Sequence, residues 1–131
     1  MRKIVLDTNA YTRLLRGDEN VLHAVASADT VYMSVFVLGE LYTGFFGGTK
    51  TNENRKLLKR FLSKPTVKIL NATSETSEFF GLIKSNLLNA GTPIPINDVW
   101  IAAHAMETGS ALLTFDQHFK KIKGLREWES I

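Results

Sequence analysis

The sequence predicts an α/β fold, a three-layer α/β/α sandwich around a short, mostly parallel central sheet. Short apolar runs typical of buried strands alternate with longer segments in which apolar residues recur at helical spacing. Strands separated by helices pair in parallel, and the helices cover both faces of the sheet. The 131 residues contain no visible linker, repeat or low-complexity tract, so we expect a single domain over residues 1–131.

In the first half of the chain, each expected strand is followed by helical spacing. Gly17 is a plausible stop for the first helix, and Ser34 is a candidate N-cap for the third. In order, the expected elements are a strand at Ile4–Leu6, a helix with Tyr11, Leu14 and Leu15, a helix with Val21, Leu22, Val25 and Ala26 that ends near Asp29, a strand at Val31–Met33 and a helix at Val35–Phe46.

The second half continues the alternation, beginning with a helix that is apolar on one face and basic on the other. A longer helix then starts with a capping box at Thr73 and Ser74 that a Glu would complete, and it ends at Gly91. Gly109 closes the following helix. The expected elements are helices at Asn52–Leu62, Thr73–Asn89 and Asn97–Thr108, and strands at Val67–Leu70, Ala111–Leu113 and Leu125–Trp128.

Composition excludes several kinds of protein. The chain has no Cys, which excludes disulfides, thiolate nucleophiles and thiolate zinc sites. No apolar stretch is long enough to span a bilayer, and the short run after Met1 stops at an acid, unlike a signal peptide. We therefore expect a cytoplasmic protein with no membrane partner. The net charge of +3 favours a polyanionic partner.

Four carboxylates stand in apolar surroundings, and they are the main clue to function. Asp7 closes the first strand, Glu40 interrupts an apolar helix, Asp98 opens an apolar helix, and Asp116 follows the strand at Ala111–Leu113. A buried carboxylate must be paired, hydrogen-bonded or metal-bound, and no Lys or Arg adjoins any of the four. If the fold brings them together at the carboxyl edge of the sheet, a hard divalent cation is their natural occupant.

Each acid also has a purely structural explanation. Asp7 would cap the first helix, Asp98 would complement a helix dipole, and Asp116 would serve in a turn. Glu40 is the hardest to explain in this way, because a mid-helix acid usually faces water and its neighbours are apolar. Four separate explanations for acids with a common placement are less economical than one shared site.

Sequence blocks around these acids resemble PIN-domain ribonucleases, and most closely the VapC toxins of toxin–antitoxin pairs. The resemblance extends from about Ile4 to Trp128, and the segment Gly47–Leu70 carries no family motif. The matching blocks, in order, are Asp7-Thr8-Asn9, Gly39-Glu40-Leu41, the long run from Ile94 to His104 that contains Asn97-Asp98, and Leu113-Thr114-Phe115-Asp116-Gln117-His118-Phe119.

The resemblance implies a Mg²⁺- or Mn²⁺-dependent endoribonuclease with one or two ions. It further implies a homodimer that a cognate VapB-like antitoxin neutralises. In the family, the positions of Asp7, Glu40, Asp98 and Asp116 line the metal site. Those of Thr8, Asn9, Asn97 and Thr114 support it. We expect Asp7 to anchor the main ion, with Asp98 and Asp116 completing the shell and Glu40 acting as a ligand or as the base that orients water.

Basic side chains are expected to follow the RNA backbone beside the site, although a solvated helix face explains the central group equally well. Single-stranded or loop RNA is the expected substrate. His118 is interpreted mainly as a loop-stabilising residue, and His104 as a packed or capping group. The predicted RNA-binding residues are Arg13, Lys50, Arg55, Lys56, Lys59, Arg60, His118, Lys120 and Lys121.

One helix is unusually rich in large apolar side chains: Phe36, Leu38, Tyr42, Phe45 and Phe46. Core packing is the default explanation. The alternative is a partly exposed apolar strip that receives a second copy of the chain or an antitoxin helix.

Two other functions fit parts of the sequence. An aspartate-based phosphohydrolase or receiver-like domain also has an acid after its first strand. However, Asn9 stands where such a phosphatase needs its second Asp, and Lys64 comes too early for the receiver lysine. A non-catalytic RNA- or protein-binding module is the other alternative. A module that only binds has no reason to keep four uncompensated acids together.

Overall fold

The structure is a computed structural model that describes residues 1–128. Its centre is a parallel sheet of four strands in the order β3-β2-β1-β4. The strands are β1 (Lys3–Leu6), β2 (Thr30–Ser34), β3 (Val67–Leu70) and β4 (Ala111–Leu113). Val5 pairs with Tyr32 of β2 on one side, and Leu6 pairs with Leu113 of β4 on the other. These bounds confirm the predicted α/β/α class and the four strands expected up to residue 113.

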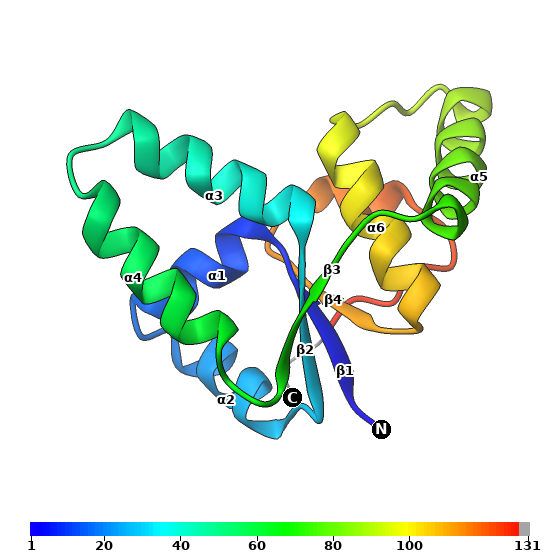
Figure 1. The fold of residues 1–131 in the computed structure, drawn as a ribbon. Coiled ribbons are helices and arrows are strands. Elements are labelled where there is room, and N and C mark those ends of the chain that lie inside the picture. Colours follow the sequence, from blue (N-terminus) through cyan, green and yellow to red (C-terminus); the bar gives the residue numbers. More distant parts are fainter. Residues whose placement is uncertain (129–131) are drawn as a thin grey trace.

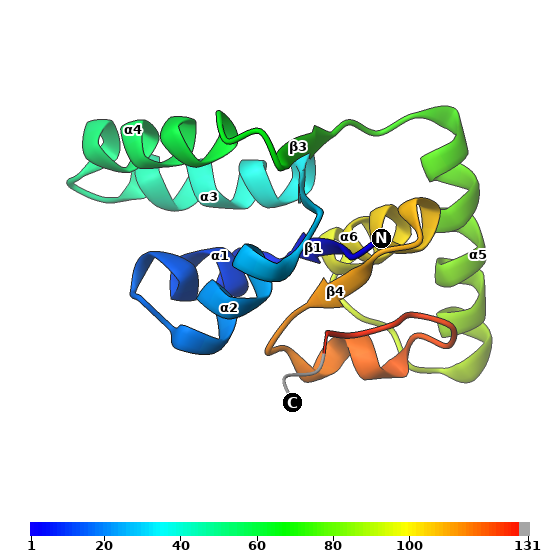
Figure 2. The ribbon, with the colours of Figure 1, turned by 90° about the horizontal axis from the view of Figure 1, so that it is seen from below.

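Helices cover both faces of the sheet, which gives the three layers visible in Figures 1 and 2. One layer contains α1 to α4, and the opposite layer contains α5 and α6. No helix in the described part of the chain is long and apolar enough to cross a membrane. The helices are α1 (Thr8–Leu15), α2 (Glu19–Ser27), α3 (Val35–Gly47), α4 (Thr51–Leu62), α5 (Ser74–Ala90) and α6 (Ile96–Thr108).

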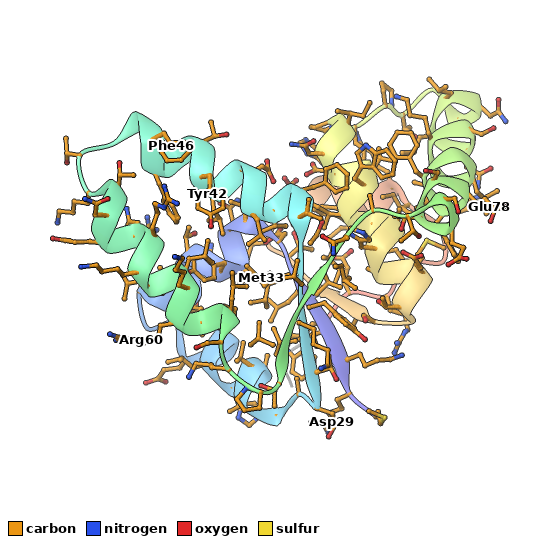
Figure 3. All side chains as sticks on the ribbon, in the orientation of Figure 1. Asp29, Met33, Tyr42, Phe46, Arg60 and Glu78 are labelled. Carbon is orange, nitrogen blue, oxygen red and sulfur yellow. The ribbon has the colours of Figure 1, made fainter. Side chains whose placement is uncertain are left out.

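The core fills the space between the sheet and the two helical layers. Val5, Leu6 and Leu112 are completely or almost completely buried, as is Met33, which lies at the centre of Figure 3. Strands buried on both faces have continuous apolar sequences, which explains why these short runs lack polar alternation. The packed core holds the strands in register. It thereby also fixes the positions of the residues that follow each strand.

Most helix ends are where the sequence predicts them. Ser34 caps α3 by accepting a hydrogen bond from the backbone nitrogen of Phe36 at 3.1 Å. Gly91 ends α5 with a left-handed backbone at φ +68°, which favours glycine. The capping box predicted at Thr73 is present, but the prediction that a Glu completes it is wrong. Position N3 is occupied by Thr76, whose hydroxyl accepts from the backbone nitrogen of Thr73.

The predicted final strand at Leu125–Trp128 is reduced to a single bridge. Glu127 pairs with Leu112 in parallel, and the nitrogen of Trp128 donates to the oxygen of Leu112 at 2.7 Å. β4 is itself only three residues long, which leaves no room for a longer ladder. A 3₁₀ helix that the sequence analysis did not anticipate, η1 (Gln117–Lys121), follows β4.

Candidate metal centre

The four acids from distant parts of the chain line one pocket. Asp7, Glu40, Asp98 and Asp116 share it with Thr8, Asn9 and Ile101. The pocket lies at the carboxyl edge of the sheet, beside β1 and β4. The order of the strands reverses between these two, because β2 and β3 lie on one side of β1 and β4 lies on the other. Open α/β sheets bind ligands at this reversal, outside the carboxyl ends of the strands.

Asp7 is the most buried of the four acids, with 5% of its surface exposed. One carboxylate oxygen, Oδ1, accepts from the backbone nitrogen of Ala10 at 2.8 Å and caps α1. The other, Oδ2, accepts from the hydroxyl of Thr114. The pKa of Asp7 is raised to about 6, mainly by burial and in smaller part by the charges of Asp98 and Asp116, while both hydrogen bonds oppose the shift. Asp7 therefore has both of the roles foreseen for it, as a helix cap and as a lining residue of the shared pocket.

Asp98 and Asp116 lie close together, and His118 contacts both of them. One ligand atom from each of the three lies within 4.8 Å of the others, close enough to hold one metal ion. His118 Nδ1 is 3.3 Å from Asp98 Oδ2 and 3.1 Å from Asp116 Oδ1. Burial is the main cause that raises the pKa of Asp98, while the hydrogen bond from His118 lowers it.

His118 is the residue whose place sequence reasoning missed. It was expected to stabilise a loop or contact RNA, whereas its ring contacts two of the acids. The 3₁₀ helix explains this position, because Asp116 caps η1 and accepts from the backbone nitrogen of His118 at 2.8 Å. The Asp-x-His spacing was a usable signal, since a cap and the residue two positions later lie close together.

Glu40 reaches the pocket from α3. Its Oε1 accepts a hydrogen bond from the Thr8 hydroxyl at 2.7 Å, which ties α3 to the start of α1. Asn9 lines the pocket, whereas Asn97 does not. Thr114 also lies outside that lining, but it contacts Asp7 directly. Thr8 and Thr114 therefore donate hydrogen bonds to the acids, whereas among the described residues the side chain of Asn97 forms no hydrogen bond with an acid.

The predicted basic residues divide into two groups. Arg13 lies near the site, because its guanidinium sits 3.7 Å from the centre of the Phe115 ring, next to Asp116. The basic residues of α4 do not line the acid pocket. Arg55 instead lies over the rings of Tyr42 and Phe46, at 5.7 and 5.8 Å. Arg60, labelled in Figure 3, lies in the last turn of α4 and lines a separate groove with residues of α1 and α2.

The residues of the pocket fit a hard divalent cation. Carboxylate oxygens are the ligands that Mg²⁺ and Mn²⁺ prefer. Among residues 1–128, no Lys or Arg forms a salt bridge with any of the four acids. Burial raises the pKa of Asp7 and of Asp98 despite the hydrogen bonds that each carboxylate accepts, so the pocket disfavours their charged forms. A bound cation would supply the missing compensation.

His104 is a packed group, as predicted. It is completely buried, and its Nδ1 lies 2.8 Å from the hydroxyl of Ser34 while Nε2 lies 3.2 Å from the carbonyl oxygen of Asn71. Burial lowers the pKa of His104. The neutral ring connects α6 to the ends of β2 and β3 behind the pocket.

Comparisons with known proteins agree with this site. The PIN-domain profile matches residues 4–125. Ribonuclease VapC2 of Rickettsia felis is 31% identical over 81% of this chain and 78% of its own. Ribonuclease VapC2 of Haemophilus influenzae is 32% identical over 96% of both chains. The profile match and these relatives show that this α/β/α sandwich with an acid-lined sheet edge is a PIN domain. The chain belongs to the PIN-domain family, and among its members it is similar to the VapC proteins.

Solved structures show the same fold. VapBC2 from Rickettsia felis, bound to a DNA fragment from its promoter, superposes with a TM-score of 0.84 at 27% identity, covering 96% of this chain and 97% of that one. VapBC-1 from nontypeable Haemophilus influenzae gives 0.86 at 25% identity, covering 97% of both chains. Family membership argues against the receiver-like and phosphohydrolase alternatives.

Proposed function

We propose that this protein is a divalent-metal-dependent endoribonuclease that cleaves single-stranded or loop RNA as the toxin of a toxin–antitoxin pair. The observation that carries the proposal is the convergence of Asp7, Glu40, Asp98 and Asp116 on one pocket. The relatives bear the name ribonuclease, which supports the reaction class. A binding-only module would gain nothing from keeping four acids so close, because like charges repel.

In this proposal Asp98 and Asp116 hold the ion together with Asp7, and His118 adjoins them. One or two Mg²⁺ or Mn²⁺ ions, when bound, lower the pKa of water and offset the charge of the phosphate. Thr114 fixes the orientation of the Asp7 carboxylate. The Thr8 hydroxyl donates a hydrogen bond to Oε1 of Glu40. The other carboxylate oxygen, Oε2, is not used in this bond, so it can accept a proton from the water that attacks the phosphate.

The partner in this proposal is a VapB-like antitoxin, because the structural neighbours are VapBC complexes. An apolar groove between α1, α2 and α4 suits part of such a protein. Leu15, Leu22 and Leu57 are all more than 40% exposed there, and Arg60 and Lys64 add positive charge. We expect the groove to bind an apolar segment that carries acidic residues.

We also propose a homodimer in the cytoplasm. The predicted apolar strip of α3 is only partly available for it. Phe45 is buried, Phe36 stacks on Trp100 at 4.9 Å, and Tyr42 is half-buried, but Phe46 is 62% exposed. Light scattering of the purified protein is the direct measurement of the dimer, and a monomer at micromolar concentration would contradict it.

The test of the nuclease uses the full chain and a labelled single-stranded RNA. We expect cleavage with Mn²⁺ or Mg²⁺, no cleavage with EDTA, and at least an approximately 100-fold loss of rate in Asp98→Asn. Glu53→Gln is the matched control, since Glu53 is an exposed acid on α4. Calorimetry with Mn²⁺ gives a second readout. Cleavage that persists in EDTA, or normal activity of Asp98→Asn, would overturn the proposal.

A further inference from the structure

A second pocket adjoins the acid pocket and shares one residue with it. Asp116 lines both. The second pocket lies between the end of β4, the 3₁₀ helix η1 and the C-terminal segment, which run side by side in Figure 2. Its lining consists of Asp116, Thr114, Phe115, Gln117, Lys120, Glu127 and Trp128. A group bound in the second pocket would therefore lie next to a group bound among the four acids.

The chemistry of this lining suits a neutral, planar, hydrogen-bonding group. Asp116 and Glu127 outnumber Lys120, so the lining offers a phosphate no net positive charge, even when an ion offsets the charge of Asp116. The amide of Gln117 provides both donors and an acceptor, which can recognise the edge of a base. Two aromatic side chains, Phe115 and Trp128, provide ring faces for stacking. These features together describe a nucleobase more closely than a phosphate or an aliphatic group.

The aromatic part of the pocket is held in place before any ligand arrives. Arg13 covers one face of the Phe115 ring at 3.7 Å and is itself tied to Asp18 at 3.6 Å. Only the other face and the edge of the ring are left for the pocket, where Phe115 remains 40% exposed. On the other side, hydrogen bonds from the backbone of Leu112 to Arg126 and from Trp128 to Leu112, at 2.8 and 2.7 Å, fix the Trp128 segment against β4.

The geometry points to a base-recognition subsite. The pocket formed by Phe115, Gln117, Lys120 and Trp128 takes the base of the nucleotide next to the phosphate that is cut. Gln117 reads the hydrogen-bonding edge of that base, and Lys120 assists as a second donor. This subsite rests on the proposed nuclease function, because Asp116 places it directly beside the acids. It gives the enzyme a sequence preference at one position adjoining the cleavage point.

The first test is a cleavage profile on an RNA library with randomised single-stranded positions. We expect the wild type to prefer particular bases at one position beside the cut, and Gln117→Ala to reduce that preference about fivefold to tenfold. Lys121→Ala is the matched control, because Lys121 is an exposed neighbour of Lys120 in η1 but does not line the pocket. Loss of a phosphate contact weakens binding to all sequences alike, so Lys121→Ala should keep the wild-type preference.

The second test measures binding without cleavage. The chain has only two tryptophans, so Trp100→Phe leaves Trp128 as the single indole fluorophore. In this background with Asp98→Asn, a short single-stranded RNA should quench Trp128 fluorescence. The same RNA with an abasic site at the preferred position should bind about fivefold to tenfold more weakly.

The outcomes separate the subsite from the nuclease. In one outcome the wild type cleaves with a base preference, and Gln117→Ala and Lys120→Ala both leave that preference unchanged. This result would overturn the proposed subsite but leave the proposed nuclease function in place. Equal binding of the intact and the abasic RNA would also overturn the subsite. A wild-type protein that cleaves no RNA would overturn the nuclease and, with it, the subsite.

Discussion

Thr114, which follows β4, donates a hydrogen bond from its hydroxyl to Oδ2 of Asp7, which follows β1. The register explains this contact. Leu6 pairs with Leu113, so the next residue of each strand lies beside the other. The Thr114 hydroxyl oxygen also accepts from the backbone nitrogen of Asp116 at 3.0 Å. A single hydroxyl thus orders two of the four acids, one on each side of the pocket.

Replacing Thr114 by Val is therefore expected to weaken metal binding while leaving the fold intact. Val has almost the same shape, but it removes the donor to Asp7 and the acceptor for Asp116. Partners that orient metal ligands typically change affinity by about 10–100-fold, and we expect a loss in this range for Mn²⁺. Calorimetric titration of the full chain with Mn²⁺ measures it.

The controls for this prediction use two other threonine variants. Thr114→Ser keeps the hydroxyl and should restore affinity to within a few-fold of the wild type. Thr43→Val removes a hydroxyl that bonds only within α3, to the carbonyl oxygen of Gly39, and should leave affinity unchanged. Wild-type affinity in Thr114→Val would show that its hydroxyl does not order the site.

The same sequence pattern, an apolar run followed by an acid, predicted both the strands of the sheet and the position of the acids at its edge. Apolar runs reveal buried strands, and an acid at the end of such a run lies at the sheet edge, as Asp7 and Asp116 do. The contact of Thr114 with Asp7 could not be predicted, because it depends on the register between strands 107 residues apart. The contact of His118 with the acids could not be predicted, because its ring reaches them only through a 3₁₀ turn. Gln117, Phe115 and Trp128 form a pocket only once the C-terminal segment pairs with β4.

The contribution of Asp7 to the stability of the metal-free protein should fall as pH rises from about 4 to about 6. The folded pKa of Asp7, about 6, exceeds the ordinary value of 3.8, so the folded state binds the proton more tightly than the unfolded state. The associated stability is complete below pH 3.8 and is lost as pH rises through 6. The shift corresponds to at most about 3 kcal/mol. Urea unfolding in EDTA at several pH values measures the effect.

Asp7→Asn isolates this contribution from all other titrations. The variant cannot ionise, so the difference in unfolding free energy between it and the wild type should grow in favour of the variant as pH rises from 4 to 6. Mn²⁺ should reverse the difference at pH 7, because the ion binds the wild-type carboxylate more strongly than an amide. A pH-independent difference would contradict the raised pKa of Asp7.

His104 makes a contribution of the opposite sign, in a window that begins at pH 6.5 and extends downward. Because its folded pKa is lowered, the unfolded state binds the proton more tightly, and stability present above pH 6.5 is lost as pH falls below it. His104→Ala should remove this dependence. It should also destabilise the protein by about 2–4 kcal/mol, since the variant loses one buried and one partly buried polar contact and leaves a cavity. His23→Ala is the exposed control. An unchanged pH profile in His104→Ala would show that this ring does not titrate differently in the two states.

The basic face of α4 should set the salt dependence of RNA binding. Lys56 and Lys59 are exposed and unpaired by any salt bridge among the described residues. If both contact phosphates, replacing both by Ala in an Asp98→Asn background should reduce the slope of log affinity against log salt by about 1.4 for a single strand. Filter binding of a labelled RNA at several salt concentrations gives the slope.

The matched control removes the same charge from the opposite edge of the sheet. Arg2 and Lys3 lie at the amino end of β1, whereas the acids follow its carboxyl end, so replacing both by Ala should leave the slope almost unchanged. Both double variants lose two positive charges, and a general effect of net charge would therefore alter the two slopes equally. Equal slopes would show that α4 is only a solvated helix face. A smaller slope in the α4 variant alone would place the RNA backbone along α4.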